Sequence, residues 1–467
     1  MAKLWEKTYT LDALMEAFTV GEDYLLDARL VNADCAASMA HARMLEGIGI
    51  LTAAETAALI RELARIIHLN GKGEFVVRRS DEDVHTAIEN HLVAAIGDAG
   101  KKIHTGRSRN DQVLAALRLW SRGFLFSFHG AGLALIARLL DFAEKHAGTP
   151  MPGRTHLQTA MPSSVGLWAA SWAEELLDDL SLSHHAFTLL DCSPLGSAAS
   201  YGVPLPLDRE KVAELLGFSR VQNNVLYAAN SRGKLEAAAL EAVEHTALTL
   251  SRIAQDLILF SLPEFGYFTL PPELCSGSSI MPQKRNPDGL ELIRGRSAAI
   301  SANLLSIKSV LRSLPGGYNR DLQETKGPYF RGCEDGLGCV RIMDLTVRKL
   351  VVNREALRKA FTPDIFATDR ALDLVSRGTP FRDAYREVGR SLESLSSADP
   401  TEALSRRKST GTPGNLRLDV PRAALAREQE WLEKEETAKR ARITSLAGAE
   451  VPLFRDPLAG SLERDGS

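Results

Sequence analysis

Hydrophobic residues recur every three or four positions along most of this chain, a spacing typical of amphipathic helices. The clearest stripe covers residues 233–260, where one apolar face continues for about seven turns. Comparable stretches cover residues 111–147, 163–190, 287–312 and 323–350. Five long helices in succession predict a long bundle, because each helix must bury its stripe against neighbours. Apolar bands on several faces also indicate that helices are shared between subunits.

Shorter helical patterns precede the bundle. They predict one helix at 34–46, with Asp34 as its N-cap, and another at 53–69. A Ser-Asp-Glu-Asp run at 80–83 is typical of the cap of a helix, which we expect to continue through Glu89.

The residues after the bundle, 362–467, show only short helical patterns. A Ser/Gly/Pro stretch at 409–414 predicts a loop, and we expect the end of the chain, 456–467, to be frayed. No repeat and no strand-rich region stands out. The sequence therefore predicts an all-α chain in three parts, which are an N-terminal helical domain (1–104), a central long-helix bundle (105–361) and a small C-terminal helical domain (362–467).

The composition narrows the class of protein. The 467 residues are 45% hydrophobic and 25% charged, and a net charge of −3 offers no bulk attraction to nucleic acid or to a membrane. We find no run of about 18 apolar residues and no secretory apolar segment, so we expect no membrane span and no export. Five scattered cysteines suit neither a disulfide framework nor a zinc site, which favours buried thiols in the cytoplasm.

The sequence GSSIMPQKRNPD at residues 277–288 carries the densest candidate chemistry of the chain. Its glycine and prolines predict a loop, and Asn286 before Pro287 predicts the N-cap of the next helix. Ser278, Lys284 and Asn286 would then lie beside a helix N-terminus, where backbone dipoles favour negative charge. A polar connecting loop with a good cap would look similar, but this order of residues favours an anion site with a potential nucleophile or base.

A second polar cluster, TGRSRNDQ at residues 105–112, opens the first long helix. Its two arginines, two hydroxyl groups and amides suit the recognition of carboxylates or phosphates. It lacks the spacing of a P-loop, so nucleotide phosphates are not indicated. The alternative is a solvated capping sequence.

A third cluster, GRTHLQ at residues 153–158, precedes the long helix that we expect to begin near Pro162. His156 within it is a candidate proton donor or acceptor near neutral pH. A hydrogen-bonded structural histidine is the alternative for this residue taken alone.

Together the three clusters favour an active site for a polyanion, because each lies at the end of a long helix and a bundle can bring such ends together. Separate subunits can also supply them. We expect neither a metal nor a cofactor, since Asp83 and His85 form only a lone pair of potential ligands.

These clusters resemble the fumarase/aspartase superfamily, whose members release fumarate from succinyl-containing substrates. Residues 277–287 match the loop that this superfamily shares. Other stretches resemble its argininosuccinate lyase branch, so that the resemblance covers nearly the whole chain. These stretches are SRNDQ at 108–112, THLQ at 155–158, YNRDLQETK at 318–326, MAHARML at 39–45 and TPD at 362–364.

The resemblance implies the reversible anti β-elimination of argininosuccinate to L-arginine and fumarate, the last step of arginine biosynthesis, in a homotetramer with shared active sites. Ser278 is the implied base, and Lys284 and Asn286 stabilise the developing negative charge. The guanidine must leave protonated, because the pKa of arginine lies above about 12. The resemblance places His156 on that side of the site, with Glu291 as its carboxylate partner.

The other matched positions are implied to bind substrate. The residues implied to bind the succinyl carboxylates are Ser108, Arg109, Asn110 and Thr155. The residues implied to bind the arginine portion or its neighbouring carboxylate are Tyr318, Gln323 and Lys326. Asp83 and His85 match a family pair near the site. Spacing supports the second group, because Gln323 and Lys326 fall three apart on one helical face.

Three stretches depart from the family pattern. Residues 4–7 read LWEK, without the double glycine of the family. A substrate-contacting serine is replaced near Asp23, whose carboxylate can either meet the α-ammonium group of the substrate or point away. The Asp-Arg-Asp of the family is Ser-Arg-Gly at 231–233, which removes two carboxylates. These changes concern fine substrate contacts and leave the elimination residues in place.

Two alternatives remain open at the level of sequence. The first is another lyase of the superfamily, such as adenylosuccinate lyase, aspartase or fumarase, against which the SRNDQ element, Gln323 and Lys326 argue. The second is a non-catalytic structural protein of the delta-crystallin type. The presence of Ser278, His156 and Lys284 counts against it.

Overall fold

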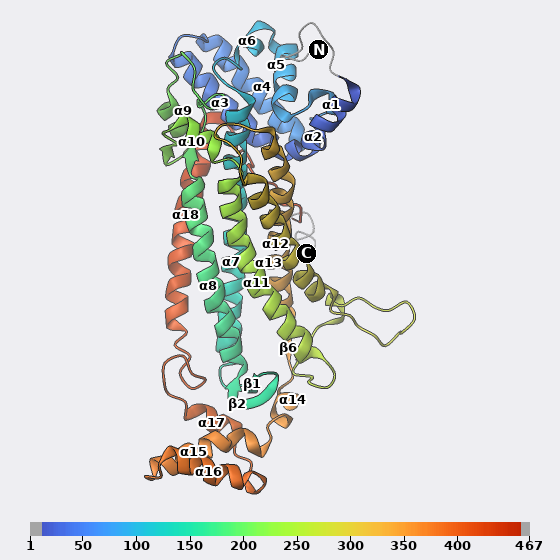
Figure 1. Cartoon of the computed structure of the whole chain (residues 1–467), viewed down its shortest axis with the longest axis vertical. Coiled ribbons are helices and arrows are strands. Elements are labelled where there is room, and N and C mark those ends of the chain that lie inside the picture. Colours follow the sequence, from blue (N-terminus) through green and yellow to red (C-terminus); the bar gives the residue numbers. More distant parts are fainter. Residues whose placement is uncertain (1–11, 459–467) are drawn as a thin grey trace.

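The computed structural model describes residues 12–458, and a bundle of long helices forms its long axis (Figure 1). All five predicted long helices are present, which confirms the central bundle. They are α7 (Arg109–Lys145), α8 (Val165–Leu190), α11 (Lys234–Ser261), α12 (Asp288–Leu311) and α13 (Lys326–Lys349). α7 packs along α8 and α13, while α11 packs along α8, α12 and α13. The departure at residues 4–7 lies outside the described residues.

The apolar stripe of α11 faces the inside of this bundle. Its residues Val243, Leu250, Ile253 and Leu257 expose no surface, and burial of each such side chain contributes about 1.5–3 kcal/mol. A glycine lets α13 approach α11 closely at one point. A Cβ atom added to Gly336 would lie 2.1 Å from Cγ1 of Val243, so any larger residue would push the two helices apart.

Short helices form a head at one end of the bundle (Figure 1). They are α1 (Ala13–Val20), α2 (Asp23–Asp27), the 3-10 turn η1 (Ala28–Leu30), α3 (Val31–Gly47), α4 (Ala53–Gly71), η2 (Arg79–Asp81), α5 (Val84–Ile96) and α6 (Asp98–Lys102). The predicted helix at 53–69 is confirmed as α4. Asp83 caps α5 by accepting a hydrogen bond from the backbone N–H of Thr86 at 2.8 Å, and the helix runs past Glu89 as predicted.

The prediction that Asp34 is an N-cap is wrong. The N-cap of α3 is Leu30, so Asp34 lies one turn inside the helix, where it is buried. Its carboxylate contacts Nδ1 of His85 at 2.8 Å instead of a free helix end. The carboxylate thus serves a contact between α3 and α5.

A β-hairpin that the sequence pattern did not predict connects α7 to α8. β1 (Pro150–Thr155) pairs antiparallel with β2 (Gln158–Ser164), and α8 begins at Val165 rather than near Pro162. The two-residue turn, His156 and Leu157, has φ angles of 52° and 61°. Both residues therefore occupy the left-handed region, as a type I′ hairpin turn requires. Two smaller sheets join β3 (Cys192–Ser193) to β4 (Arg220–Val221) and β5 (Phe268–Thr269) to β6 (Val351–Val352).

The connection between α8 and α11 returns to the head and carries α9 (Arg209–Leu215) and α10 (Val225–Asn230). Ser231, one of the departures from the family pattern, accepts a hydrogen bond from the buried guanidinium of Arg118 at 2.8 Å. Gly233, the other, is the N-cap of α11 with a φ of 75°, a conformation that glycine adopts at little cost. Both replacements therefore have structural uses.

The C-terminal region forms the other end of the molecule and then turns back along it (Figure 1). Its elements are α14 (Arg354–Lys359), η5 (Pro363–Phe366), α15 (Ala367–Ser376), α16 (Phe381–Arg390), η6 (Leu392–Ser394), α17 (Pro400–Ser405) and α18 (Asp419–Ala447). The expectation of only short helices here is wrong, because α18 has 29 residues and packs against α7 and α8. The division of the chain at residue 361 stays a prediction.

Of the end that was predicted to be frayed, residues 459–467 lie outside the described residues, whereas residues 456–458 are fixed to the bundle. Asp456 forms an ion pair with Arg341 of α13, and its Oδ1 accepts a hydrogen bond from the backbone of Leu458. The cysteines are all free; four are buried, as expected, whereas Cys275 is only half-buried.

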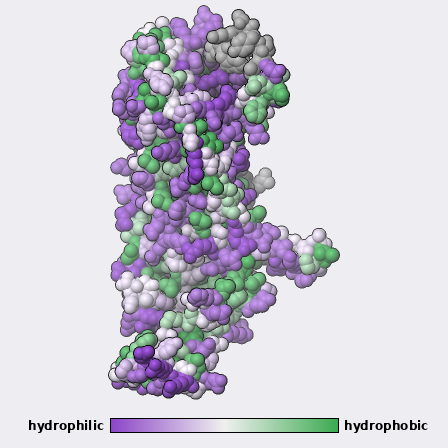
Figure 2. Space-filling view, viewed as in Figure 1, coloured by the Kyte–Doolittle hydropathy of each residue, from purple (hydrophilic) through white to green (hydrophobic). Residues whose placement is uncertain are grey.

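Polar and apolar residues are mixed over the face shown in Figure 2, from which one loop stands out. Among the described helices, α7 alone is long and apolar enough to cross a membrane, and 61% of its most apolar window is buried inside the structure. Core helices of globular proteins have this character.

Candidate active site

A polar cavity of about 150 Å³ lies where the head meets the first turns of α7 and α13. Eight of the ten residues predicted to bind substrate line it, although they come from four separate stretches of sequence. They are Asp23, Asp83, His85, Arg109, Asn110, Tyr318, Gln323 and Lys326. We call this cavity the head pocket. A larger cavity of about 510 Å³ lies among α15, α16 and α17, and none of the predicted site residues lines it.

Lys326 is the buried centre of the head pocket. Its ammonium group lies 2.6 Å from Oδ1 of Asp23 and 2.6 Å from Oδ1 of Asp27. Burial opposes the charge of Lys326, but the two carboxylates outweigh it and raise the pKa of the lysine. Burial likewise opposes ionisation of Asp27, and Lys326 with His85 overcomes it, which lowers the pKa of Asp27. Asp23 lines the pocket with its carboxylate on Lys326, and its contact with the α-ammonium group of the substrate stays a prediction.

Arg109 places a second charged group of the pocket at the start of α7. Its guanidinium contacts Glu82 at 3.1 Å and Asp83 at 3.0 Å. The side chain is partly exposed, at 31%, so the arginine remains accessible from the cavity. An arginine placed at a helix N-terminus suits an incoming carboxylate.

His85 completes the buried polar layer beneath the pocket. Its Nδ1 contacts Oδ2 of Asp34 at 2.8 Å, and both side chains are almost fully buried. Burial lowers the pKa of His85, but Asp34, followed by Asp83 and Asp27, outweighs that effect and raises it above the ordinary value. The fold therefore favours the imidazolium form of His85 more than water does.

The rim of the head pocket carries the residues of the 3-10 turn η4 (Arg320–Thr325). Arg320 and Gln323 both donate hydrogen bonds to the backbone carbonyl of Thr19, at 2.7 and 3.2 Å. The end of α1 is thus held at the mouth. Tyr318 stacks under the guanidinium carbon of Arg232, which lies 5.4 Å from the ring centroid.

Two predicted substrate-binding residues do not line the head pocket. Ser108 is the N-cap of α7 and shares a capping box with Asp111, so its hydroxyl already accepts the backbone N–H of Asn110. Thr155 lies in β1 next to the hairpin turn, with His156 beside it, and both are exposed. At about 1.5 Å per residue, the 37 residues of α7 place this hairpin about 55 Å from Arg109.

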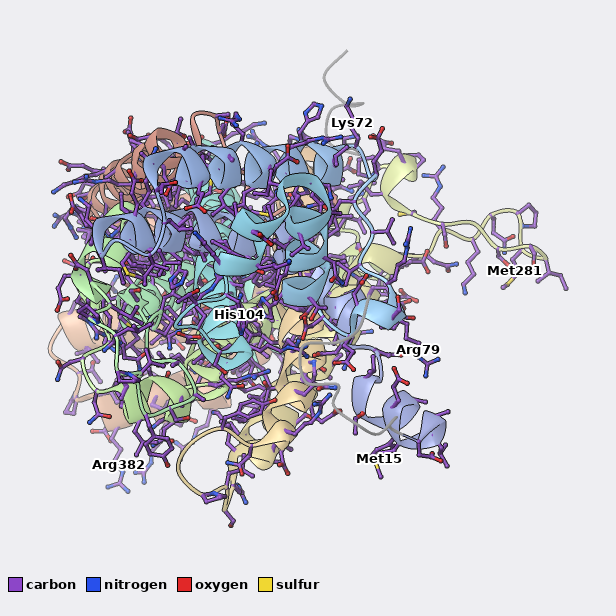
Figure 3. The ribbon with its side chains drawn as sticks, turned by 90° about the horizontal axis from the view of Figure 1, so that it is seen from above. Met15, Lys72, Arg79, His104, Met281 and Arg382 are labelled. Atoms are coloured by element: carbon purple, nitrogen blue, oxygen red, sulfur yellow. The ribbon has the colours of Figure 1, made fainter. Side chains whose placement is uncertain are left out.

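The loop with Ser278 lies at a third position. Two backbone hydrogen bonds between Ser276 and Asn286, at 3.0 and 2.9 Å, close its base. Seen from above, the loop stands away from the body of the molecule with Met281 near its tip, whereas His104 lies over the middle of the bundle (Figure 3). Inside the loop, Oγ of Ser278 accepts the backbone N–H groups of Met281 at 3.1 Å and Ile280 at 3.4 Å.

The prediction that Asn286 caps the next helix is wrong. The N-cap of α12 is Pro287 and the helix begins at Asp288, because the backbone of Asn286 is bonded across the loop to Ser276. The amide of Asn286 turns back into the loop, where Nδ2 donates to Oγ of Ser276 and to the carbonyl of Gly277, both at 3.4 Å. The neighbouring Lys284 is exposed.

The implied His156–Glu291 pair is not formed within one chain. Glu291 lies exposed in the first turn of α12, and among the described residues it shares no hydrogen bond or ion pair with His156. The pairing therefore stays a prediction.

The structure adds charged residues that the sequence reasoning did not assign to the site. These are Asp27, Glu82, Arg232 and Arg320. Three of them lay next to assigned positions, since Glu82 precedes Asp83, Arg320 lies within the YNRDLQETK stretch, and Asp27 falls one helical turn after Asp23. In the part of the chain that the structure describes, no three His, Cys, Asp or Glu residues are grouped to hold a metal ion.

Comparisons with known proteins give relatives of high coverage. Residues 6–301 match a family model described as a lyase. An argininosuccinate lyase of Sorangium cellulosum is 47% identical over 417 residues, covering 89% of this chain and 97% of that protein. An argininosuccinate lyase of Thermotoga neapolitana is 44% identical, covering 83% of this chain and 97% of that protein.

Solved structures share the fold at lower identity. EDDS lyase in complex with formate superposes with a TM-score of 0.79 at 24% identity, covering 95% of both chains. The class II fumarase of Schistosoma mansoni superposes with a TM-score of 0.68 at 18% identity, covering 85% of this chain and 96% of that one.

Proposed function

This chain belongs to the argininosuccinate lyase family of the fumarase/aspartase superfamily, and we propose that each of its active sites is assembled from regions of different copies of the chain. The enzyme acts on a small molecule, converting argininosuccinate reversibly to L-arginine and fumarate by β-elimination. The regions proposed to meet are the head pocket, the hairpin turn with His156 and the loop with Ser278.

The separation of these regions within one chain carries the proposal. The hairpin lies about 55 Å along α7 from Arg109. The Ser278 loop precedes α12, and the 24 residues of this helix span about 36 Å. The helix ends at Leu311, whose side chain lies beside Gly233, the residue that follows Arg232 of the head pocket. One substrate of ordinary size cannot reach two such regions of the same chain.

Antiparallel packing of several bundles would bring the three regions together. In a dimer with two-fold symmetry, the head of one bundle can lie beside the far end of its partner, and a tetramer of such dimers supplies a third copy for the loop. We therefore infer a homotetramer with shared sites. Because the cysteines are free thiols, we assign the enzyme to the cytoplasm. We assign no metal or cofactor to the site.

Ser278 is proposed to remove the proton next to the substrate carboxylate. A serine hydroxyl is a weak base, so its alkoxide needs stabilisation. The backbone N–H groups of Ile280 and Met281 already point at its Oγ, and Lys284 and Asn286 belong to the same loop. Docking against a partner would exclude water from the loop and strengthen these interactions.

His156 is proposed to protonate the guanidine nitrogen that leaves, with Glu291 of another copy as its carboxylate partner. Its φ of 52° lies in the left-handed region, which the type I′ turn requires of both its central residues. Here the hairpin presents the imidazole at the tip of the bundle.

We propose that each charged part of the substrate binds to the region whose side chains suit it. Arg109 with Asn110, Ser108 and the distant Thr155 would receive the succinyl carboxylates. The arginine portion would enter the head pocket, whose assigned residues are Asp23, Asp83, His85, Tyr318, Gln323 and Lys326.

Mixing two inactive variants tests whether the site is shared. We expect His156→Asn and Ser278→Ala each to lose nearly all activity as pure tetramers. After dissociation and reassembly of an equal mixture, about one quarter of the sites should combine a native His156 from one copy with a native Ser278 from another. Fumarate formation from argininosuccinate should therefore recover to about 25% of the native rate.

Subunit exchange must be verified independently, for example by mass spectrometry of differently tagged chains. Recovery that stays at background after verified exchange would mean that one chain supplies both residues, and would overturn the shared site.

A further inference from the structure

One arginine side chain supports the turn that carries His156. Arg154 lies in β1, two residues before His156, and is partly buried, whereas both residues of the turn are exposed. Its Nη1 donates a hydrogen bond to the backbone carbonyl of Leu157 at 2.9 Å. Arg154 precedes the turn and Leu157 is its second central residue, so the bond ties the two sides of the turn together.

The same guanidinium also joins the turn to the end of α11. Its Nη2 donates a hydrogen bond to the hydroxyl of Tyr267 at 3.2 Å, and its central carbon lies 4.7 Å from the ring centroid of Phe265. Tyr267 is only 2% exposed and stacks on Phe260, with ring centroids 5.6 Å apart. We call Phe260, Phe265 and Tyr267 the aromatic platform. Arg154 therefore anchors an exposed turn on a buried part of the fold.

The residues of the turn explain why it needs this support. A type I′ turn requires left-handed angles, which glycine adopts readily but which the Cβ atoms of His156 and Leu157 make unfavourable. A hydrogen bond from a charged donor to the carbonyl of Leu157 offsets part of this cost. Within residues 12–458, Arg154 forms no ion pair, and the hydrogen bonds of its guanidinium go to two neutral oxygen atoms. The guanidinium is thus used to hold the turn rather than to neutralise an acid.

We propose that Arg154 is a positioning residue, which keeps the His156 turn in its left-handed geometry and thereby aims the imidazole at the nitrogen that leaves. Arg154 acts through the backbone of Leu157 and does not touch the reacting atoms. This assignment rests on the proposed role of His156 as the proton donor. Because the head pocket of another copy is proposed to hold most of the substrate, a misplaced imidazole should lower kcat and leave KM nearly unchanged.

Two substitutions at Arg154 measure this effect in the assembled enzyme. Arg154→Met keeps an apolar stem but removes both hydrogen bonds. It should lower kcat for fumarate formation from argininosuccinate by about 10- to 100-fold, with KM within about twofold of the native value. Arg154→Lys can bond the carbonyl of Leu157 with its ammonium group but cannot also reproduce the bond to Tyr267. Its kcat should therefore lie between those of Arg154→Met and the native enzyme.

A glycine in the turn tests whether Arg154 acts through backbone geometry. Leu157→Gly supplies the left-handed conformation without help from Arg154. Added to Arg154→Met, it should raise kcat by about tenfold, whereas alone it should keep kcat within about twofold of the native value. A change in the turn would not repair lost packing at the aromatic platform. The control is Arg354→Met, which removes an exposed arginine of α14, a helix that packs against β1, and should keep the native kcat and KM.

Failure of Leu157→Gly to raise the kcat of Arg154→Met would overturn the positioning role. A rise in KM at unchanged kcat in Arg154→Met would also overturn it, because Arg154 would then contact the substrate itself. His156→Asn is measured alongside. If it keeps the native kcat, the assignment of the proton donor fails, and the role of Arg154 fails with it. If His156→Asn loses activity while Arg154→Met does not, only the positioning role of Arg154 fails.

Discussion

The head pocket and the Ser278 loop are built in opposite ways. In the pocket, most charged side chains are buried and already paired, as with Lys326 between Asp23 and Asp27. In the loop, Lys284 is exposed, the hydroxyl of Ser278 accepts backbone N–H groups of its own loop, and the segment stands clear of the body (Figure 3). The groups that we assign to recognition are therefore largely pre-formed within one chain, whereas we propose that the groups assigned to chemistry need another copy of the chain.

Because of this difference, we expect substitutions in the two regions to affect stability and catalysis separately. A change among the buried pairs must disturb the fold, because it leaves a charge without its partner. A change in the loop removes few contacts of the chain itself, so it should alter turnover and leave folding intact. The two regions can thus be distinguished by measuring both quantities on the same variants.

The largest effect is expected for Ser278→Ala. If Ser278 is the base, its loss should lower kcat by about 10²- to 10⁴-fold. Substrate affinity and melting temperature should change little, because the hydroxyl makes only local backbone contacts. Steady-state kinetics with argininosuccinate and a thermal melt measure both.

Ser279→Ala is the matched control for this variant, because it removes the adjacent exposed hydroxyl from the same loop. It should keep kcat within about tenfold of the native value, well above Ser278→Ala. Near-native turnover in Ser278→Ala would refute its role as the base.

A pair of lysine variants compares the two regions directly. Lys326→Met leaves Asp27 buried without its ammonium partner, which should destabilise the fold by about 3–5 kcal/mol. Lys284→Met, in the exposed loop, should change stability by no more than about 0.5 kcal/mol while lowering kcat sharply. Chemical denaturation at fixed protein concentration, together with activity, would reveal the contrast. Equal stability of the two variants would contradict a pre-formed pocket.

Much of this arrangement could be predicted from the sequence because it follows local rules. The helical stripes gave the five bundle helices, and residues within short motifs, such as Tyr318, Gln323 and Lys326, do meet in one cavity. What local rules could not reveal were partners distant in sequence. Asp34 has the local sequence pattern of an N-cap, but its carboxylate contacts His85 of another helix.

The hairpin was missed, and a cap at Asn286 was wrongly predicted, for related reasons. A type I′ turn normally shows Asn-Gly or a similar pair, whereas here His156 and Leu157 adopt its left-handed angles. Asn286 before Pro287 has the sequence of an N-cap, but backbone hydrogen bonds to Ser276 hold Asn286 within the loop. The long α18 was missed because its apolar face is weak, with only five of its residues buried.

The smallest expected effect concerns His85 and tests the pocket through pH. Its pKa is raised in the fold, so the stabilisation from its imidazolium form is fully present below about pH 6.5, the ordinary value, and is lost as pH rises through the folded pKa. Asp34→Asn removes the leading cause of that rise, and burial then favours the neutral ring. The melting temperature of the native protein should therefore fall by a few degrees relative to this variant between about pH 6 and pH 8.5. The control is Glu46→Gln, which alters an acid of the same helix that pairs with Arg43 and should keep the native pH profile. A native pH profile in Asp34→Asn would mean that other acids hold the proton on His85.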